Sequence, residues 1–154
     1  MTDTYADHIT YGLWVGPIEE AAEHADKYDT IISVCQDART ENVSDETPYY
    51  HIPLADDEQS EAEWGGSCSY ATFREAANTL EEVWYVGWND EDILIHCHHG
   101  KNRSVAVTAA VVSICEEPHL TVEETIDEIQ YIRPIADPSG LMRSHAKRWV
   151  LENK

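Results

Sequence analysis

Positive charge is scarce in this sequence. Only 10 of the 154 residues are lysine or arginine, against 30 aspartates and glutamates, which gives a formal net charge of −20 at pH 7. Because proteins bind the phosphate backbone of nucleic acids through basic surfaces, this composition argues against a nucleic-acid partner. Any phosphorylated substrate must be held by local positive groups against the repulsion of the whole molecule.

Cysteines and long apolar runs are also few. The four cysteines, which show no CxxC pairing, are Cys35, Cys68, Cys97 and Cys115. Since no secretory signal precedes them, we expect a reducing, cytoplasmic setting and exclude a disulfide scaffold. The longest apolar run, residues 105–115, is interrupted by Thr108 and Ser113 and is too short to span a bilayer, so no membrane span is expected.

The acidity does not indicate disorder. Apolar residues make up 42% of the chain, and the acidic residues are spread along it. Such a composition resembles that of proteins from salt-in halophiles, haloarchaea in particular, in which salt screens the self-repulsion of the surface. The length and the absence of repeats predict one domain over residues 1–154, of unknown oligomeric state.

Strand and helix patterns alternate along the chain. Apolar and β-branched runs predict strands at residues 9–16 (a hairpin or edge strand), 30–35, 49–54 and 93–96. Helical spacing and start signals predict helices at residues 18–28, 70–86 and 103–116, then from a Thr121–Glu124 capping box to 132, and from an Asp137 N-cap to 150. Residues 36–48 and 55–69 are expected to be loops. This order predicts an α/β fold with a central, mostly parallel sheet of four to five strands flanked by helices.

The segment of residues 93–104 carries the chemistry. A short apolar strand is followed by Cys97, a five-residue loop with a glycine, then Arg103 and an apolar helix. At the carboxyl end of a central strand, loop N–H groups and a helix N-terminus favour an anion, and Arg103 can bind two phosphate oxygens at once. The same positive field lowers the pKa of Cys97, so the thiolate is the candidate nucleophile toward a bound phosphorus.

Residues 96–104 (HCHHGKNRS) resemble the HCxxGxxR[ST] signature of the cysteine-dependent protein tyrosine phosphatases, and the context resembles their small dual-specificity branch. The resemblance covers nearly the whole chain, including residues 13–16, 31–34, 50–56 and 131–138. It implies a phosphatase P-loop between the central strand and the buried helix. The implied function is a phosphomonoester hydrolase with a phosphocysteine intermediate, acting on phosphorylated protein without a metal or other cofactor.

The resemblance also implies roles for individual residues. Cys97 is the nucleophile, and Asp56 is the general acid, with Asp57 as the alternative. Ser104 hydrogen-bonds the cysteine, and His96 orients it from behind the loop. The phosphate is bound by Arg103 together with the loop residues His98, His99, Gly100, Lys101 and Asn102. Cys35 is a candidate redox partner of Cys97, beside the plainer interpretation as a core cysteine.

Other interpretations stay open at this point. Lys101 and Asn102 also resemble the loops of RNA 5′-triphosphatases, so an RNA 5′-triphosphatase or a nucleotide or phosphoinositide phosphatase of the same fold is the enzyme alternative. The non-enzyme alternative is an inactive phospho-binding module. The pair His98–His99 lacks the further ligands that a zinc site needs, so no metal is expected. Trp64 is a candidate for the wall of the cleft, and the resemblance places the family's late asparagine-type position near Ser139.

Overall fold

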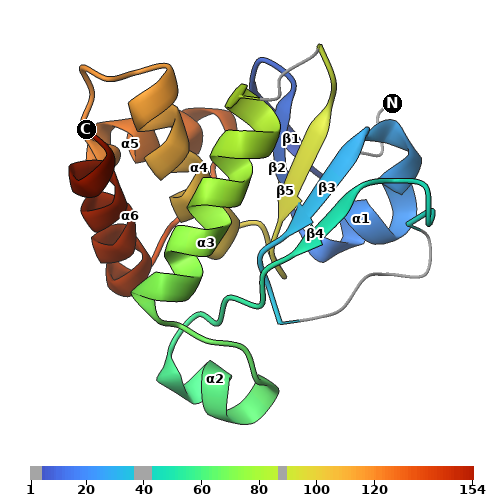
Figure 1. The fold of residues 1–154 in the computed structure, drawn as a ribbon, viewed down its shortest axis with the longest axis horizontal. Helices are drawn as coiled ribbons and strands as arrows, with labels where there is room; N and C mark the ends of the chain where they lie inside the picture. Colours follow the sequence, from blue (N-terminus) through green and yellow to red (C-terminus); the bar gives the residue numbers. More distant parts are fainter. Residues whose placement is uncertain (1–4, 37–42, 87–89) are drawn as a thin grey trace.

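A mostly parallel sheet forms the centre of the molecule (Figure 1). The computed structural model describes residues 5–36, 43–86 and 90–154. Within them the sheet has five strands in the order β1-β2-β5-β3-β4. The strands are β1 (Asp7–Thr10), β2 (Leu13–Gly16), β3 (Thr30–Ser33), β4 (Tyr49–His51) and β5 (Ile93–His96). Only β1 runs antiparallel to its neighbour, so the predicted fold class is confirmed.

Helices cover both faces of the sheet (Figure 1). One face carries α1 (Ile18–His24) and the 3-10 turn η1 (Ala25–Lys27). The other carries α3 (Tyr70–Leu80), α4 (Arg103–Cys115), α5 (Val122–Ile132) and α6 (Gly140–Asn153). The two faces follow from the alternation of side chains along a strand: Ile93 and Ile95 join the core under α4, whereas Leu94 joins the core under α1. None of the described helices combines the length and the apolarity needed to cross a membrane.

The register of the strands creates a common edge for a site. β5 pairs with β2 on one side and with β3 on the other, so that His96 lies opposite both Gly16 and Ser33. Three strands therefore end at the same level. The chain leaves this edge through Cys97 and returns as α4, whose first eleven residues are all buried. Ligands bind at this carboxyl edge in open α/β sheets.

Several predicted boundaries were wrong. The strand predicted at residues 49–54 ends at His51, because Pro53 has no N–H to donate to a neighbouring strand. The predicted helix at 18–28 ends at His24 and tightens into η1. The predicted helix at 70–86 changes after Leu80 into a π-helical turn η2 (Glu81–Val86), which keeps Trp84 in the core. Part of the loop predicted at residues 36–48 lies outside the described residues.

The last helix begins later than predicted. Its N-cap is Ser139, whose hydroxyl accepts a hydrogen bond from the Met142 N–H, and not Asp137. The Asp137 carboxylate instead contacts Arg143 at 3.3 Å, while its backbone N–H donates to the Lys101 carbonyl. The capping box of α5 is present as predicted.

The loop predicted at residues 55–69 contains a helix, α2 (Glu58–Trp64), which projects from the body of the molecule (Figure 1). The two ends of the segment that carries α2, residues 53–55 and 67, are hydrogen-bonded to each other. The Ala55 N–H donates to the Ser67 carbonyl at 3.0 Å, and the Ser67 N–H donates to the Pro53 carbonyl at 2.9 Å. Asp56 therefore directly follows the hydrogen-bonded end of this segment.

Candidate active site

The anion loop, residues 97–102, connects β5 to α4 and is tightly packed. Gly100 adopts φ +66°, and a Cβ there would lie 2.6 Å from both the Gly16 carbonyl carbon and Arg133 Nη2. The loop is also bonded to α1, because the Ile18 N–H donates to the His98 carbonyl at 3.1 Å. Only glycine fits at position 100 without moving the loop away from the end of β2.

Arg133 supports the anion loop from behind, a role that the sequence analysis missed. This side chain is 4% exposed, and its Nε donates to the Gly100 carbonyl at 2.7 Å while Nη2 donates to the His99 carbonyl at 3.3 Å. Nη1 bonds to the Tyr5 carbonyl and to the Asp7 carboxylate. Because the C=O and N–H of a planar trans peptide point in opposite directions, drawing these carbonyls outward turns the following N–H groups toward the inside of the loop.

Cys97 is the first residue of the anion loop and directly follows β5. It is 2% exposed, and its Sγ is 3.1 Å from Ser104 Oγ. Burial raises the pKa of Cys97, but this is outweighed by the positive charge of Arg103 and by hydrogen bonds from the Ser104 hydroxyl and the Ser104 and Gly100 N–H groups. The pKa therefore lies below its ordinary value, which favours the thiolate.

Replacing Ser104 by alanine tests this local electrostatic arrangement. We expect the pKa of Cys97 to rise in Ser104→Ala, because one donor to the thiolate is lost. The pH profile of iodoacetamide alkylation at Cys97 measures the shift. The matched control is Ser113→Ala on the same helix, since that hydroxyl donates to the Leu120 carbonyl instead. Identical profiles for Ser104→Ala and the wild type would refute the contribution of the hydroxyl.

Two further residues singled out in the sequence, His96 and Cys35, are buried. His96 is buried, and its Nδ1 contacts the Cys97 carbonyl at 3.2 Å. Cys35 is buried and forms no disulfide, and its Sγ lies 3.2 Å from Ser33 Oγ. Cys97 forms no disulfide either.

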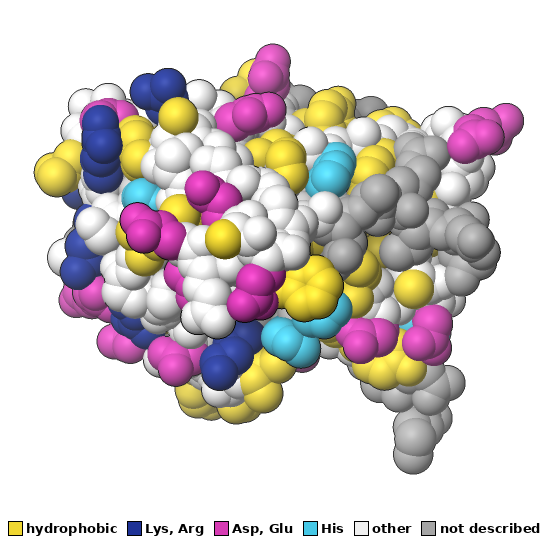
Figure 2. All heavy atoms as spheres, turned by 90° about the horizontal axis from the view of Figure 1, so that it is seen from below, with side chains coloured by type: hydrophobic (Ala, Val, Ile, Leu, Met, Phe, Trp, Pro, Cys, Tyr) yellow, Lys and Arg dark blue, Asp and Glu magenta, His cyan; other side chains and the backbone are white. Residues whose placement is uncertain are grey.

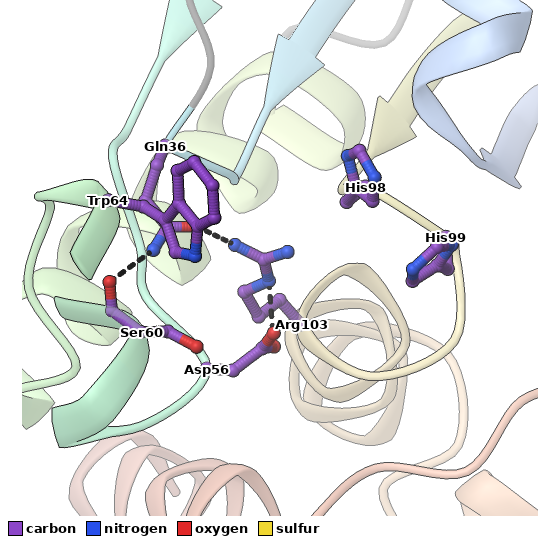
Figure 3. A pocket seen from close by; sticks show the side chains of 7 residues that line it. All are labelled: Gln36, Asp56, Ser60, Trp64, His98, His99 and Arg103. Carbon is purple, nitrogen blue, oxygen red and sulfur yellow. Dashed lines mark hydrogen bonds and ion pairs between the residues drawn. The ribbon is translucent and has the colours of Figure 1, made fainter.

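Arg103 is held by groups from two other segments (Figure 3). Nη1 donates to the Leu54 carbonyl at 2.8 Å and to Gln36 Oε1 at 2.7 Å. Gln36 in turn donates through Nε2 to the carbonyls of Ser60 and Gly65, at 3.2 and 3.3 Å. Gln36, which lies just beyond β3, thus joins the arginine to the base of α2. Its position in a predicted polar loop gave no indication of this role.

The two neighbouring aspartates have different positions. Asp56 Oδ1 lies 2.9 Å from Arg103 Nε and accepts a hydrogen bond from Asn102 Nδ2 at 3.0 Å. Asp57 is the N-cap of α2 and accepts from the Ser60 N–H at 2.7 Å. Asp56 therefore points at the anion loop, whereas the carboxylate of Asp57 is engaged by its own helix.

Two cavities meet at the pair formed by Asp56 and Arg103. One, of about 380 Å³, is lined by Asp56, Cys97, His99, Lys101, Asn102, Arg103, Asp137, Pro138 and Ser139. The other, of about 340 Å³, is lined by Gln36, Asp56, Ser60, Trp64, His98, His99 and Arg103 (Figure 3). The nucleophile candidate opens into the first, and the indole of Trp64, 73% exposed, forms a wall of the second, as predicted.

The surface around the cleft carries histidine, hydrophobic and acidic side chains. Figure 2 shows this face with histidines next to apolar side chains, with a basic side chain beside them and acidic groups on several sides. The rings of His98 and His99 are 4.5 Å apart in an edge-to-face arrangement. Among the residues that the structure describes, no three His, Cys, Asp or Glu side chains are grouped so that they could hold a metal ion.

Comparisons with known proteins give a match in structure only. No protein-family model matches the sequence, and no match is found among curated proteins. Human DUSP28 is similar with a TM-score of 0.73 and 15% identity, over 98% of this chain and 96% of that one. A mouse putative dual specificity phosphatase complexed with zinc tungstate has a TM-score of 0.75 and 14% identity, over 98% and 89% of the two chains. A human tyrosine phosphatase-like serine/threonine/tyrosine-interacting protein has a TM-score of 0.70 and 16% identity, over 96% of each chain. The chain therefore has the fold of the dual-specificity phosphatases.

Proposed function

We propose that this protein is a cysteine-dependent phosphomonoester hydrolase that acts on phosphotyrosine, and on phosphoserine or phosphothreonine, in proteins. One observation carries the proposal. The Cys97 thiol belongs to a glycine-containing loop, lies 3.1 Å from the Ser104 hydroxyl, and has a pKa that Arg103 and hydrogen bonds lower despite its burial. The Asp56 carboxylate lies 2.9 Å from Nε of the same arginine. A nucleophile, an oxyanion-binding group and an acid thus share one cleft, which is the set that phosphoryl transfer needs.

The reaction has two steps, which form and then hydrolyse a phosphocysteine. In the first, Cys97 Sγ bonds to phosphorus as the ester P–O bond breaks, and the leaving oxygen keeps the electron pair and takes a proton from Asp56. In the second, water attacks phosphorus and gives a proton to Asp56, while the S–P bond breaks and Ser104 donates a hydrogen bond to the departing thiolate. Arg103 and the N–H groups of the anion loop stabilise the charge on the phosphoryl oxygens in both steps.

The substrate must approach an acidic molecule. The helix α2, whose Ser60 and Trp64 line the cleft, also carries Glu58, Glu61 and Glu63, and these charges disfavour RNA and other polyanions. Lys101 lines the same cavity as Cys97, and its positive charge favours a substrate that carries a second phosphate group. The side chain of Asn102 is bonded to Asp56 and to the Ser139 N–H, so it supports a polyphosphate substrate less than its position in the sequence suggested.

A substrate panel tests the proposal. The protein is purified in high salt and given a phosphotyrosine peptide, a phosphoserine peptide and a 5′-triphosphate RNA, with Cys97→Ser as the control. We expect turnover of the peptides by the wild type alone. Turnover of the RNA alone would favour the triphosphatase, and binding of all three without turnover would favour a phospho-binding module. The fold does not separate these outcomes, because one structural neighbour is described as phosphatase-like.

The choice between the two aspartates is tested by parallel substitutions. Asp56→Asn is expected to lower kcat on a phosphoserine peptide by about 10²–10⁴-fold, because the proton donor to a poor leaving group is lost. Asp57→Asn is the matched control, since asparagine is as good an N-cap as aspartate and α2 is retained. A greater loss in Asp57→Asn than in Asp56→Asn would reverse the assignment.

Salt dependence follows from the charge. With a net charge of −20, we expect the protein to unfold in dilute buffer and to fold in molar KCl, because the screening length falls from about 10 Å at 0.1 M to about 3 Å at 1 M salt. Circular dichroism and phosphatase activity over a KCl series measure this, with sucrose of equal osmolality as the control that does not screen. Full activity in dilute buffer without salt would contradict it.

A further inference from the structure

Asn102 occupies the N-cap position of α4 but does not cap this helix. Its backbone has φ −114° and ψ −74°, and its side chain makes no hydrogen bond to the N–H groups of the first turn. Asparagine is among the best capping residues because its side-chain oxygen accepts such a bond. Here the helix forgoes that stabilisation, and the side chain points to a different set of partners.

The amide of Asn102 connects two segments that lie on either side of the anion loop. Oδ1 accepts from the Ser139 N–H at 2.8 Å, and Nδ2 donates to Asp56 Oδ1 at 3.0 Å. The orientation of the amide is fixed by this arrangement, because a backbone N–H only donates and must face the amide oxygen. Ser139 is itself held as the N-cap of α6, so the donor toward Asp56 is aimed by the start of a helix.

Both contacts to the Asp56 carboxylate fall on the same oxygen. Arg103 Nε lies 2.9 Å from Oδ1, and Asn102 Nδ2 lies 3.0 Å from it. An incoming phosphate also needs Arg103, because this arginine is the buried cation beside Cys97. A bound phosphate therefore competes with Asp56 for Arg103 Nε and repels the carboxylate. The bond from Asn102 does not take part in that competition.

We propose that Asn102 is a positioning residue that keeps Asp56 over the anion loop when a phosphate takes Arg103. Because Asn102 holds Oδ1, Oδ2 is the oxygen that carries the proton to the leaving group. This inference rests on the proposed function, in which Asp56 is the general acid. It gives Asn102 a role apart from binding phosphate.

The test compares leaving groups. We expect Asn102→Ala to lower kcat/KM about 10–100-fold on phenyl phosphate and on a phosphoserine peptide, whose leaving oxygens need a proton. On para-nitrophenyl phosphate, whose leaving group departs readily without one, the loss is expected to stay within about threefold. Inhibition by inorganic phosphate is expected to be unchanged, since Arg103 and the loop N–H groups remain. The matched control is Asn78→Ala, because Asn78 bonds to Trp149 Nε1 away from the cleft.

A second variant separates the loss of the Asn102 hydrogen bonds from a loss of folding. In Asn102→Ser the hydroxyl can cap α4, but it is too short to link Ser139 to Asp56, so the same dependence on the leaving group is expected. Equal losses on all substrates, or no loss on any, would overturn the positioning role while leaving the proposed function intact. Absence of turnover in the wild type on every ester would overturn both, and it is seen before any variant is compared.

Discussion

Cys97→Ser is expected to abolish turnover, with kcat at least about 10⁴-fold below the wild type, while inorganic phosphate still binds. A serine hydroxyl remains protonated at neutral pH, whereas the pKa of Cys97 is lowered by Arg103 and by hydrogen bonds despite its burial. The groups that bind phosphate, Arg103 and the loop N–H groups, are unchanged by this substitution. Steady-state kinetics and titration with inorganic phosphate measure the two effects separately.

Cys115 supplies the matched control. Burial and the nearby Glu81 carboxylate raise the pKa of Cys115 to about 12, so its thiol is protonated at neutral pH and is a poor nucleophile. Cys115→Ser is expected to keep full activity. Alkylation of the wild type at neutral pH is expected to modify Cys97 and to stop turnover. Residual activity of Cys97→Ser near the wild-type level would exclude the phosphocysteine route.

The parts of the fold that the sequence predicted are those with local signals. The segment from β5 to α4 was predicted because a buried strand, a glycine and an apolar helix follow one another within a few residues. The start of α5 was predicted for the same reason, since the capping box joins Thr121 to Glu124 within one turn. Asp56, in contrast, was assigned only through the resemblance of residues 50–56 to the phosphatase segment that leads to the general acid, and its carboxylate lies 2.9 Å from Arg103 Nε.

The helix α2 was not predicted because it lacks apolar periodicity. α2 has no buried residue, so no apolar stripe marks it. Its start signals are present, with Asp57 as N-cap and with Glu58 and Glu61 in the first turn. Capping and charge alone would have predicted it.

The residues that support the site were missed for a different reason. Gln36 and Arg103 are 67 positions apart, and Arg133 reaches back 33 positions to Gly100. No local pattern indicates such partners, because only the tertiary fold brings them together. A signal for Arg133 existed in the composition: with six arginines in 154 residues, an arginine at the end of an amphipathic helix is worth testing as a buried anchor.

Arg103→Lys is expected to lower kcat/KM by about 10²–10³-fold, although the charge is conserved. The guanidinium reaches Leu54, Gln36 and Asp56 through two nitrogens at 2.7–2.9 Å, and its planar fork also suits two phosphate oxygens. A single ammonium group cannot make these contacts together and bind the phosphate as well. The control is Arg148→Lys, which changes an exposed arginine that stacks on Tyr70 and pairs with Glu152.

A second measurement separates the charge of Arg103 from its geometry. Burial raises the pKa of Cys97, and the positive charge of Arg103 is the largest of the effects that lower it. Arg103→Lys keeps a cation near the thiol, so the pH profile of alkylation at Cys97 is expected to shift upward less than in Arg103→Gln, which removes the charge. Turnover, in contrast, is expected to fall steeply in both. If Arg103→Lys kept wild-type turnover, charge alone would suffice at this position. The planar shape of the guanidinium and its hydrogen bonds to Leu54 and Gln36 would then have no catalytic importance.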